Sequence, residues 1–566
     1  MDERPWHRAY DDGVPPSVDF DATPLSEWVA RAAERWPDRP AVLWLNARLT
    51  YAQLHDEVER MASALAGMGV EQGTRVAIQM PNLPQLVIGY FAVLRLGGIV
   101  VMTNPMYTPH EVVHQWNDAG VEVALVMDFL YEQKLHEIRG AVPVREWVLA
   151  SIPEYLRFPM RQIAPFKLRR RDPPAIAMAP AEEPVHRFRE LVRSTEATAP
   201  GADVDADDVA VLQYTGGTTG VSKGAVLSHR NLGANVQQIT AWFPDVEMGG
   251  EVVLAALPLF HVFGMTIAMN WAVWTGAGIA MQTDPREVAA IVRNIERHRV
   301  TLLPAVPAMF NAINRYPGID KADLTSIKRC FSGSAPLAEE VLRRFEQLTG
   351  AVIIEGFGMS ETSPVTHANP LGGTRKIGTV GVPVPNTDMK IVDPEDPSAT
   401  MPVGTEGELL IRGPQVMQGY WQSPDETAQS LRDGWLHTGD LAVVDAAGYT
   451  TIVGRTKDMI NCSGFKVFPD EVDQVLMAHP SVLETATIGV PDEARGETVK
   501  SFIVVQPGAH LTVAEVQDYC REQLASYKVP REIEFLDELP KSAVLKILRR
   551  ELRAREIEKR GAQERA

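Results

Sequence analysis

The segment Tyr214-Thr-Gly-Gly-Thr-Thr-Gly-Val-Ser-Lys-Gly224 follows an apolar, strand-like run from Val209 to Gln213. Glycines let the backbone approach an anion and adopt φ > 0, the threonine and serine hydroxyls donate hydrogen bonds, and Lys223 adds a positive charge. We interpret the segment as a loop that holds a polyphosphate, and a flexible surface loop is the alternative. It differs from the Walker P-loop, because Lys223 is followed by glycine rather than by serine or threonine.

The composition is that of a large, acidic, globular protein. A chain of 566 residues exceeds a single hydrophobic core, so we expect a large domain and at least one smaller one. Hydrophobic residues make up 45% and charged residues 23%, which argues against disordered and fibrous classes. The net charge of -18 repels a nucleic-acid backbone, so we expect no nucleic-acid partner. The three cysteines are widely spaced and predict neither a disulfide framework nor a metal cluster, as in a reducing cytosol.

Two stretches bear on targeting and membranes. The charged start, Met1 to Trp6, lacks the apolar core of a signal peptide, so we expect a cytoplasmic protein. The uncharged stretch from Val252 to Met281 is long enough to span a bilayer, but it contains Pro258, His261 and three glycines. We therefore predict that this stretch forms buried strands and a helix of a large core.

The segment from Tyr155 to Arg171 is basic and aromatic within an acidic chain. It holds six basic and three aromatic residues and no acidic one. Two interpretations remain open: a peripheral contact with anionic lipid at the inner face of a membrane, and a solvated loop, which we favour.

The first half of the chain has the pattern of an α/β layer fold. A capped amphipathic helix is expected from Thr50, with apolar residues at helical spacing up to Leu65, and a strand is expected over 75–79. Helices and short apolar strands then alternate to about Val126. Residues 183–207 are polar and are expected to connect this region to the strand before the Gly/Thr loop.

A second group of loops follows strands further along the chain. We predict a strand over 327–331, a turn over 332–335, a helix from Pro336 to Leu348, and a strand over 352–355 that ends in a loop over 356–361. Loops after the carboxyl ends of strands line the ligand crevice of α/β sheets. We therefore expect these loops and the Gly/Thr loop to share one site.

The sequence pattern changes twice in the last third of the chain. From Gly378 to about Asp440 it is rich in strands and punctuated by glycine, which predicts a small β subdomain. After residues 454–458, helices alternate with strands in a compact α+β module. We place the boundary near Lys457, which divides the chain into an N-terminal domain, 1–456, and a mobile C-terminal domain, 457–566.

Six motifs follow one another in order and cover nearly the whole chain. They are Tyr214 to Gly224, Pro258-Leu-Phe-His-Val-Phe-Gly264, Gly356-Phe-Gly-Met-Ser-Glu361, Gly434-Trp-Leu-His-Thr-Gly-Asp440, Gly454-Arg-Thr-Lys-Asp458 with Ser463-Gly-Phe-Lys466, and Pro540-Lys541 through Lys546. Their order and spacing resemble those of the adenylate-forming superfamily, which comprises acyl-CoA synthetases, nonribosomal-peptide adenylation domains and luciferases. The sequence as a whole is most similar to long-chain fatty acid CoA ligases.

The resemblance implies an α/β enzyme that joins a medium- to long-chain fatty acid to CoA in two steps. The carboxylate first attacks the α-phosphate of MgATP to give acyl-AMP and pyrophosphate, and the CoA thiol then displaces AMP. Lys546 would stabilise charge in the first step, Glu361 with Thr215 would bind Mg²⁺, and His261 would stand at the mouth of the acyl site. The implied catalytic residues are Lys546, Glu361, Thr219 and His261.

The resemblance also assigns the nucleotide and CoA contacts. Asp440 and Arg455 would bind the ribose, Phe357 would stack on adenine, and Lys457 would be the hinge between half-reactions. The phosphate contacts would be Thr215, Gly216, Gly217, Thr218, Thr219, Gly220, Lys223 and Lys546. The adenine site would comprise Gly333, Ser334, Ala335, Glu355, Gly356, Phe357, Gly358, Met359 and Ser360, and the face presented to CoA would contain Gly464 and Lys466.

Two positions depart from the family pattern. Leu545 stands where glycine usually precedes the catalytic lysine, so a φ > 0 there would be costly. Asn461 stands where many acyl-CoA ligases carry lysine. Two alternative functions stay open: an acyl-AMP ligase that delivers to a carrier protein or another acceptor, and a nucleotide- or lipid-binding pseudoenzyme. A homodimer also stays open.

Overall fold

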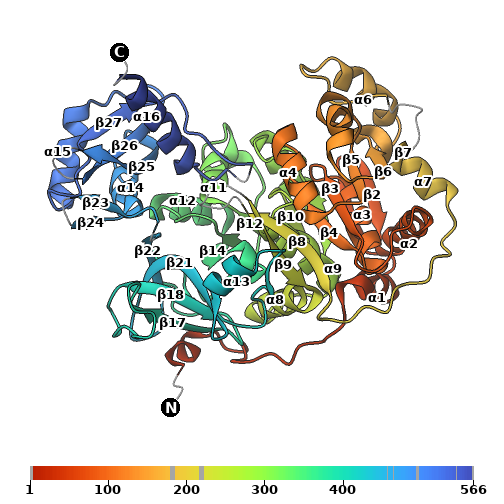
Figure 1. The fold of residues 1–566 in the computed structure, drawn as a ribbon, viewed down its shortest axis with the longest axis horizontal. Coiled ribbons are helices and arrows are strands. Elements are labelled where there is room, and N and C mark those ends of the chain that lie inside the picture. The colour runs from red at the N-terminus through yellow and green to blue at the C-terminus, as the bar shows by residue number, and fades with distance from the viewer. Residues whose placement is uncertain are drawn as a thin grey trace.

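The computed structural model describes residues 4–178, 185–215, 222–455, 457–462, 465–492, 496–543 and 545–563. Two large α/β layers and a smaller β-sheet form the bulk of the molecule, and the C-terminal residues form a small α+β unit at one end (Figure 1). This architecture confirms the expected α/β fold class.

The first large sheet runs in the order β16-β15-β14-β13-β12-β10-β11-β1-β2. Its centre, from β14 to β1, is parallel, whereas β15, β16 and β2 run antiparallel to their neighbours. The strands are β1 (Pro40–Trp44), β2 (Ala47–Thr50), β10 (Val252–Ala255), β11 (Gly278–Met281), β12 (Leu302–Ala305), β13 (Arg329–Ser332), β14 (Val352–Gly358), β15 (Val365–Ala368) and β16 (Val382–Pro383).

The second large sheet runs in the order β19-β9-β8-β4-β3-β5-β6-β7. Strands β8 to β7 are parallel, and β4 and β5 are apolar throughout, as expected of a sheet whose two faces are covered by helices. The strands are β3 (Arg75–Gln79), β4 (Ile99–Met102), β5 (Val123–Met127), β6 (Glu146–Ala150), β7 (Val185–Arg187), β8 (Val209–Thr215), β9 (Lys223–Ser228) and β19 (Gly419–Tyr420).

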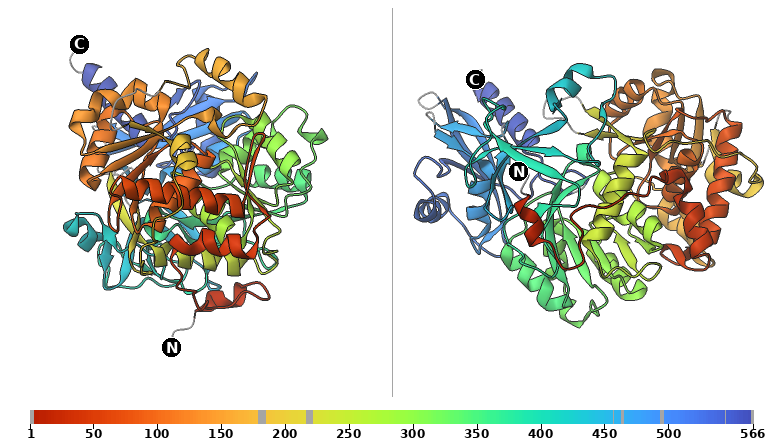
Figure 2. Two further views of the ribbon diagram at one scale, coloured as in Figure 1. Left: turned by 90° about the vertical axis from the view of Figure 1, so that its right-hand side faces the viewer. Right: turned by 90° about the horizontal axis from the view of Figure 1, so that it is seen from below.

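The helices of the first half begin at clear local signals. At α2 the Thr50 hydroxyl accepts from the Gln53 amide while the Gln53 side chain accepts from the Thr50 amide, which confirms the expected capped helix. The helices of the N-terminal part are α1 (Trp28–Arg35), α2 (Tyr51–Gly67), α3 (Pro84–Arg95), α4 (Pro109–Ala119), α5 (Asp128–Leu130), α6 (Met160–Arg169), α7 (Phe188–Ser194), α8 (His229–Trp242), α9 (Trp271–Thr275), α10 (Val288–His298), α11 (Pro307–Asn314), α12 (Glu339–Thr349) and α13 (Pro424–Ser430). In the left view of Figure 2 the red and orange helices lie in front and the blue C-terminal unit lies behind.

Two smaller sheets complete the chain. The expected β subdomain is β17 (Asp388–Val392), β18 (Gly407–Arg412), β20 (Leu431–Arg432), β21 (Trp435–Val444) and β22 (Thr450–Arg455). The C-terminal unit contains β23 (Ile460–Cys462), β24 (Phe465–Val467), β25 (Val482–Asp492), β26 (Gly496–Val505) and β27 (Glu532–Phe535), with α14 (Pro469–Met477), α15 (Val513–Gln523) and α16 (Arg549–Gln563). Its buried residues form two clusters of their own, separate from the main core. These separate cores support Lys457 as the boundary between the two domains, which remains a proposal.

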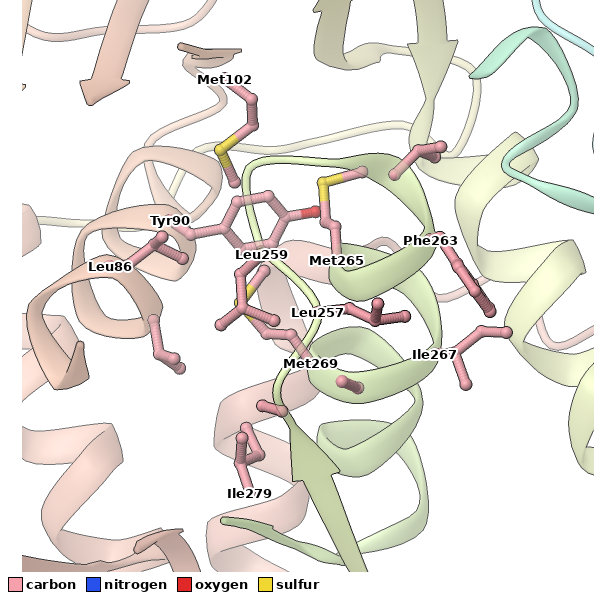
Figure 3. Packing of buried hydrophobic residues seen from close by; sticks show 14 of the residues in the cluster. Leu86, Tyr90, Met102, Leu257, Leu259, Phe263, Met265, Ile267, Met269 and Ile279 are labelled. Carbon is pink, nitrogen blue, oxygen red and sulfur yellow. The ribbon is translucent and has the colours of Figure 1, made fainter. Parts of the chain in front are cut away.

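The apolar stretch from Val252 to Met281 folds into the core, as predicted. It forms β10, a π-helix over Gly264–Asn270, α9 and β11. Figure 3 shows Leu86 and Tyr90 of α3 facing Met265 and Met269 of this segment. Among the described residues, no helix combines the length and the apolar character needed to cross a membrane.

Three local predictions were wrong. Residues 160–169 form helix α6 instead of a solvated loop, and 185–194 form β7 and α7 within the expected connector, because β7 extends the second sheet beside β6. Helix α12 begins at Glu339, not at Pro336, because the Leu337 amide donates to the Glu355 carboxylate at 3.1 Å and Ala338 stays extended.

Candidate active site

The candidate site lies where both large sheets meet the small β-sheet. The Gly/Thr loop connects β8 to β9 of the second sheet, whereas the loops after β13 and β14 belong to the first. Strand β19 joins the groups, because it pairs with β9 while the amide of Met417, just before it, donates to the backbone oxygen of Glu361 at 2.8 Å. The predicted loops are therefore brought together from two sheets instead of one.

The two strands that flank the Gly/Thr loop form an antiparallel pair. Thr215, at the end of β8, pairs in register with Lys223, at the start of β9. The predicted phosphate contacts Gly216, Gly217, Thr218, Thr219 and Gly220 lie outside the described residues.

Lys223 lies beside an acidic and an aromatic side chain. Its ammonium is 3.3 Å from the Glu426 carboxylate of α13 and 5.8 Å from the centre of the Tyr420 ring. The lysine side chain keeps about a quarter of its surface exposed. It can therefore exchange the carboxylate for another anion without leaving a buried charge unpaired.

Glu361 is held by a residue that the sequence motifs did not reveal. The Tyr420 hydroxyl donates to the Glu361 carboxylate at 2.8 Å. Burial raises the pKa of Tyr420, and the negative charge of Glu361 raises it further, so the hydroxyl stays a donor. Residues 419–420 belong to none of the sequence motifs, and only the contact with Glu361 identifies Tyr420 as part of the site.

The surroundings of Glu361 fit Mg²⁺ bound together with a nucleotide. Mg²⁺ prefers one or two carboxylates plus phosphate oxygens and water to an all-protein cage. In the part of the chain that the structure describes, no group of three or more His, Cys, Asp or Glu side chains could hold a metal by itself. A single carboxylate on the turn 360–362, which contacts β8 and β9, matches this preference, and Thr215 is the last residue of β8.

The two predicted adenine loops are tied to each other. Ser334 adopts φ +73°, and the Glu355 carboxylate accepts from the Leu337 amide two residues beyond the first loop. Burial raises the pKa of Glu355, which is almost fully inside the protein. Glu355 therefore fixes the shape of the 333–337 loop, while Ser334 and Ala335 remain exposed.

The glycines after Glu355 are required by close packing. A Cβ on Gly356 would lie 2.4 Å from the Phe331 ring, and one on Gly358 would lie 1.9 Å from the backbone oxygen of Pro364. Between them, the half-buried Phe357 packs edge-on against His367 with the ring centres 6.0 Å apart. Residues 356–358 extend β14 instead of forming a free loop, and they pair with β15. Met359 and Ser360 lead from this strand into the turn that holds Glu361.

Asp440 and Arg455 form the clearest polar pair of the site. They are register partners on β21 and β22, and the Arg455 guanidinium donates to Asp440 Oδ1 at 2.9 Å. Burial raises the pKa of Asp440, although the positive charges of Arg455 and Lys546 oppose this effect. The other oxygen, Oδ2, is buried and has no hydrogen-bond partner among the described residues. A buried acceptor of this kind suits a hydroxyl donor supplied by a ligand.

Lys546 reaches this pair from the C-terminal unit. It lies in a tight hairpin in which Lys541 and Ile547 form an antiparallel bridge. The Ser542 amide donates to the backbone oxygen of Lys546, and the Leu545 amide donates to the backbone oxygen of Ser542. Burial lowers the pKa of Lys546, Arg455 lowers it further, and Asp440 raises it. The Lys546 side chain is exposed, and its charge acts on Asp440 across the boundary between the two units.

Leu545 adopts the conformation that its position had suggested. Its φ is +59°, in the left-handed region that favours glycine. The side chain packs against the main core of the N-terminal part, although the residue belongs to the C-terminal unit. The leucine therefore does not displace Lys546 from Asp440 and Arg455.

A second network supports the same hairpin. Arg549 begins α16 three residues after Lys546, and its guanidinium binds Asp470 and Asp473 of α14, the latter at 2.6 Å. Asp473 also accepts from the Thr487 hydroxyl at 2.7 Å. This buried network attaches the end of the Lys546 hairpin to α14.

His261 lies near Lys546 at the edge of the apolar core. Burial lowers the pKa of His261 to about 4, and the positive charge of Lys546 adds to this effect. Its Nδ1 accepts from the Phe263 amide at 3.3 Å, which fits a neutral imidazole. A neutral ring beside the π-helix can contact a carboxylic substrate without trapping it as an ion pair.

The structure groups some predicted residues and separates others. Electrostatic coupling links His261, Glu361, Asp440, Arg455 and Lys546 in one site. Lys466 lies on β24, and its charge acts on Glu406 near the small β-sheet. Lys457 is exposed at the start of the C-terminal unit, and Gly464 lies outside the described residues. Asn461 is exposed on β23, where its amide donates to Glu497 at 2.8 Å.

Two family profiles match the sequence of this chain. The profile of the family described as "AMP-binding enzyme" matches residues 29–421, and that of "AMP-binding enzyme C-terminal domain" matches residues 471–546. The chain is 40% identical over 561 residues to the long-chain-fatty-acid–CoA ligase of Bacillus subtilis, covering 98% of this chain and 99% of that protein. It is 32% identical to 4-coumarate–CoA ligase 2 of Oryza sativa, covering 95% and 94%.

Solved structures share the whole architecture. The anthranilate CoA ligase AuaEII in complex with anthranoyl-AMP matches with a TM-score of 0.84 and 27% identity, over 96% of this chain and 98% of that one. ATP-bound MatB from Rhodopseudomonas palustris matches with a TM-score of 0.79 and 28% identity, over 94% and 98%. Both likenesses extend through the C-terminal unit.

Proposed function

The chain belongs to the family of AMP-binding enzymes, and from this premise we propose that it is an ATP-dependent fatty acyl-CoA ligase. It joins a medium- to long-chain fatty acid to CoA through an acyl-adenylate, with AMP and pyrophosphate as the other products. The full-length likeness to long-chain-fatty-acid–CoA ligases supports the substrate class. The observation that carries the proposal is the placement of Lys546 beside the Asp440–Arg455 pair.

The first step brings two anions together, so positive charge and positioning decide its rate. Asp440 accepts the ribose hydroxyls through its unpartnered Oδ2, and Arg455 keeps this carboxylate ionised and oriented. One oxygen of the fatty-acid carboxylate attacks the α-phosphorus, and the bond to pyrophosphate breaks. Lys546 stabilises the negative charge that gathers on the α-phosphate and carboxylate oxygens; such a contact contributes on the order of 10² to 10³ in rate.

Glu361 is the residue that would hold Mg²⁺, with Thr215 beside it at the phosphate loop. When bound, the metal supplies charge neutralisation for the leaving pyrophosphate. Tyr420 orients the Glu361 carboxylate for this task by donating to one of its oxygens. Lys223 leaves Glu426 for the phosphates, because a triphosphate carries more charge than one carboxylate.

The second step uses a different arrangement of the C-terminal domain. The CoA sulfur attacks the acyl carbon, the bond to the adenylate oxygen breaks, and the thiol proton is lost to the surroundings. In the observed arrangement the charge of Lys466 acts on Glu406. We propose that the domain turns about Lys457 between the steps and brings the 463–466 face to CoA, as such closing motions commonly separate chemical steps.

The products formed from a panel of acids test the assignment. We incubate the protein with MgATP, CoA, and acetate, aryl acids and fatty acids together, and identify the products by mass spectrometry. Fatty acyl-CoA and AMP are expected. Acyl-AMP without thioester would favour the alternative, an acyl-AMP ligase that delivers to a carrier protein, and acyl-CoA formed only from aryl acids would contradict the fatty-acid assignment.

The remaining alternative is a nucleotide- or lipid-binding pseudoenzyme. Leu545 and Asn461 motivated this alternative, but with Leu545 in a left-handed conformation the charge of Lys546 still acts on Asp440. ATP binding without release of pyrophosphate, for every acid tested, would support it.

We also propose a cytoplasmic enzyme that touches the inner face of the membrane through 155–171. Phe158, just before helix α6, and Ile163 and Phe166 on this helix are exposed among basic residues, and insoluble fatty acids reside in membranes. Cys330, Cys462 and Cys520 are all buried, and their wide spacing in the sequence offers no disulfide framework, as in a reducing compartment.

We also propose that the protein forms a homodimer. Sedimentation equilibrium at several protein concentrations tests it. A mass twice that of the 62.4 kDa chain is expected for the dimer, and a constant single-chain mass would contradict it.

A further inference from the structure

A groove separate from the candidate active site lies beside α6. It has a volume of about 740 Å³ and is walled by β2, the first turns of α2, the segment 154–158, the start of α6, and α7. Figure 1 places α6 at the end of the molecule that is remote from the C-terminal unit. The proposed catalytic mechanism uses none of the side chains that line this groove.

The groove gathers five arginines, most of which form no ion pair with the described acidic residues. It is lined by Arg48, Arg157, Arg161, Arg189 and Arg193. Within the described residues, only Arg189 of these five forms an ion pair, with Glu57 at 2.8 Å. The other four guanidinium groups therefore leave a local excess of positive charge in a chain whose net charge is -18.

The acidic residues of the groove are largely neutralised. Asp56 pairs with Arg60 at 2.9 Å, and Glu57 accepts from Tyr155 as well as from Arg189. Burial raises the pKa of Glu154 to about 7, so this side chain is partly protonated near neutral pH. The positive charge of the unpaired arginines is thus not cancelled from inside the groove.

An apolar surface adjoins the charged groove. Phe158 lines the groove and is 77% exposed, and Ile163 and Phe166 on α6 are also exposed. Leu45, another exposed apolar residue, lies next to Asn46, which exchanges hydrogen bonds with the Arg157 backbone. Guanidinium groups and large apolar side chains thus share one rim, which is the arrangement found in proteins that bind the membrane interface.

We propose that this groove binds the phosphate headgroup of an anionic phospholipid while the apolar residues of α6 contact its acyl chains. Arginine suits this ligand, because its planar fork can hold a phosphate through two hydrogen bonds. The remainder of the acidic protein is repelled by an anionic surface, so the groove sets the orientation of docking. The inference rests on the proposed membrane contact and adds to it a defined lipid site.

A soluble lipid separates the groove from the general charge of the segment. We titrate the full-length protein with dihexanoyl-phosphatidylglycerol below its micelle concentration, using calorimetry. The groove variant is R161Q/R193Q, and the control is R169Q/R170Q, which removes the same charge from exposed positions of the same helix and the residue after it, outside the groove. We expect saturable binding that weakens at least tenfold in the groove variant and less than twofold in the control. Equal loss in both variants, or no saturable binding by the unmodified protein, would overturn the lipid site.

Vesicles distinguish this proposal from the membrane contact itself. The loss of charge alone should weaken partition to phosphatidylglycerol vesicles roughly fivefold for each arginine removed, in both variants. The groove variant is expected to lose more than this charge effect. Vesicle binding without any excess loss in the groove variant would keep the membrane contact and reject the groove. Binding of soluble lipid without vesicle binding would reject docking to a membrane and assign the groove to a free anion. Unchanged octanoyl-CoA synthesis in both variants would confirm that they are folded.

Discussion

Leu545 offers a sharp test of how the two domains cooperate. Its side chain packs on the main core of the N-terminal part only while the C-terminal unit holds Lys546 at the site. Its backbone at φ +59° belongs to the hairpin itself and travels with it. Shortening the side chain should therefore weaken the first half-reaction and spare the second.

The expected loss of activity depends on two separate free-energy contributions, the packing of the Leu545 side chain and the conformation of its backbone. Burying about half of a leucine side chain stabilises the observed arrangement, in which the C-terminal unit packs on the N-terminal part, by about 1 kcal/mol. Removing it in L545A or L545G should lower the rate of pyrophosphate exchange about fivefold, since 1.4 kcal/mol corresponds to about tenfold. Left-handed backbone costs a non-glycine residue roughly 1 to 2 kcal/mol, and this cost is present in either arrangement of the domains.

The assays keep the two terms apart. Fatty-acid-dependent exchange of labelled pyrophosphate into ATP measures adenylation, and CoA added to synthetic acyl-AMP measures thioester formation. Both variants should lose the same factor in exchange and little in thioester formation, whereas L545G should resist urea better than L545A by about 1 kcal/mol. Full exchange activity in L545A would refute the packing argument, and higher activity in L545G alone would show that backbone strain, not packing, controls Lys546.

Further predictions concern single side chains and pH. K546Q should lose on the order of 10² to 10³ in pyrophosphate exchange while it still converts supplied acyl-AMP to acyl-CoA, and equal losses in both assays would contradict the role of Lys546. Y420F should raise the Mg²⁺ concentration needed for half-maximal exchange, with a loss of about tenfold at low Mg²⁺, because Glu361 loses a charge-assisted hydrogen bond. Burial lowers the pKa of His229 to about 4 and that of His367 to about 3, so the unfolded chain binds more protons between these values and about 6.5. The free energy of unfolding in urea should therefore fall as the pH is lowered from 7 to 5. In H229Q this free energy should fall less steeply over the same range. An equal slope in H229Q would mean that the two histidines are already protonated in the folded protein.

Local chemistry in the sequence predicted most of the regular elements. The Thr50 cap and the helical spacing after it located α2, and continuous apolar runs located strands such as β3. These signals are local, since a cap and a face are set within a few residues. The late start of α12 was missed because the deciding bond comes from Glu355, 18 residues beyond Leu337 in the chain.

The site was predicted in part for the same reason. Motif residues such as Asp440 and Lys546 are visible in the sequence, but their proximity depends on how two domains pack. Tyr420 was missed because it touches Glu361 from a strand 59 residues further along the chain. The groove beside α6 combines arginines from β2, α6 and α7, so only the fold brings their charges together.

The origin of the oxygen in AMP tests the central claim most directly. A fatty acid labelled with ¹⁸O at both carboxylate oxygens is incubated with the protein, MgATP and CoA, and the nucleotides are examined by mass spectrometry. Attack of the carboxylate on the α-phosphorus at the Lys546 site predicts one ¹⁸O in each AMP and none in pyrophosphate. Unlabelled AMP, or ADP accompanied by labelled phosphate, would contradict the adenylate mechanism.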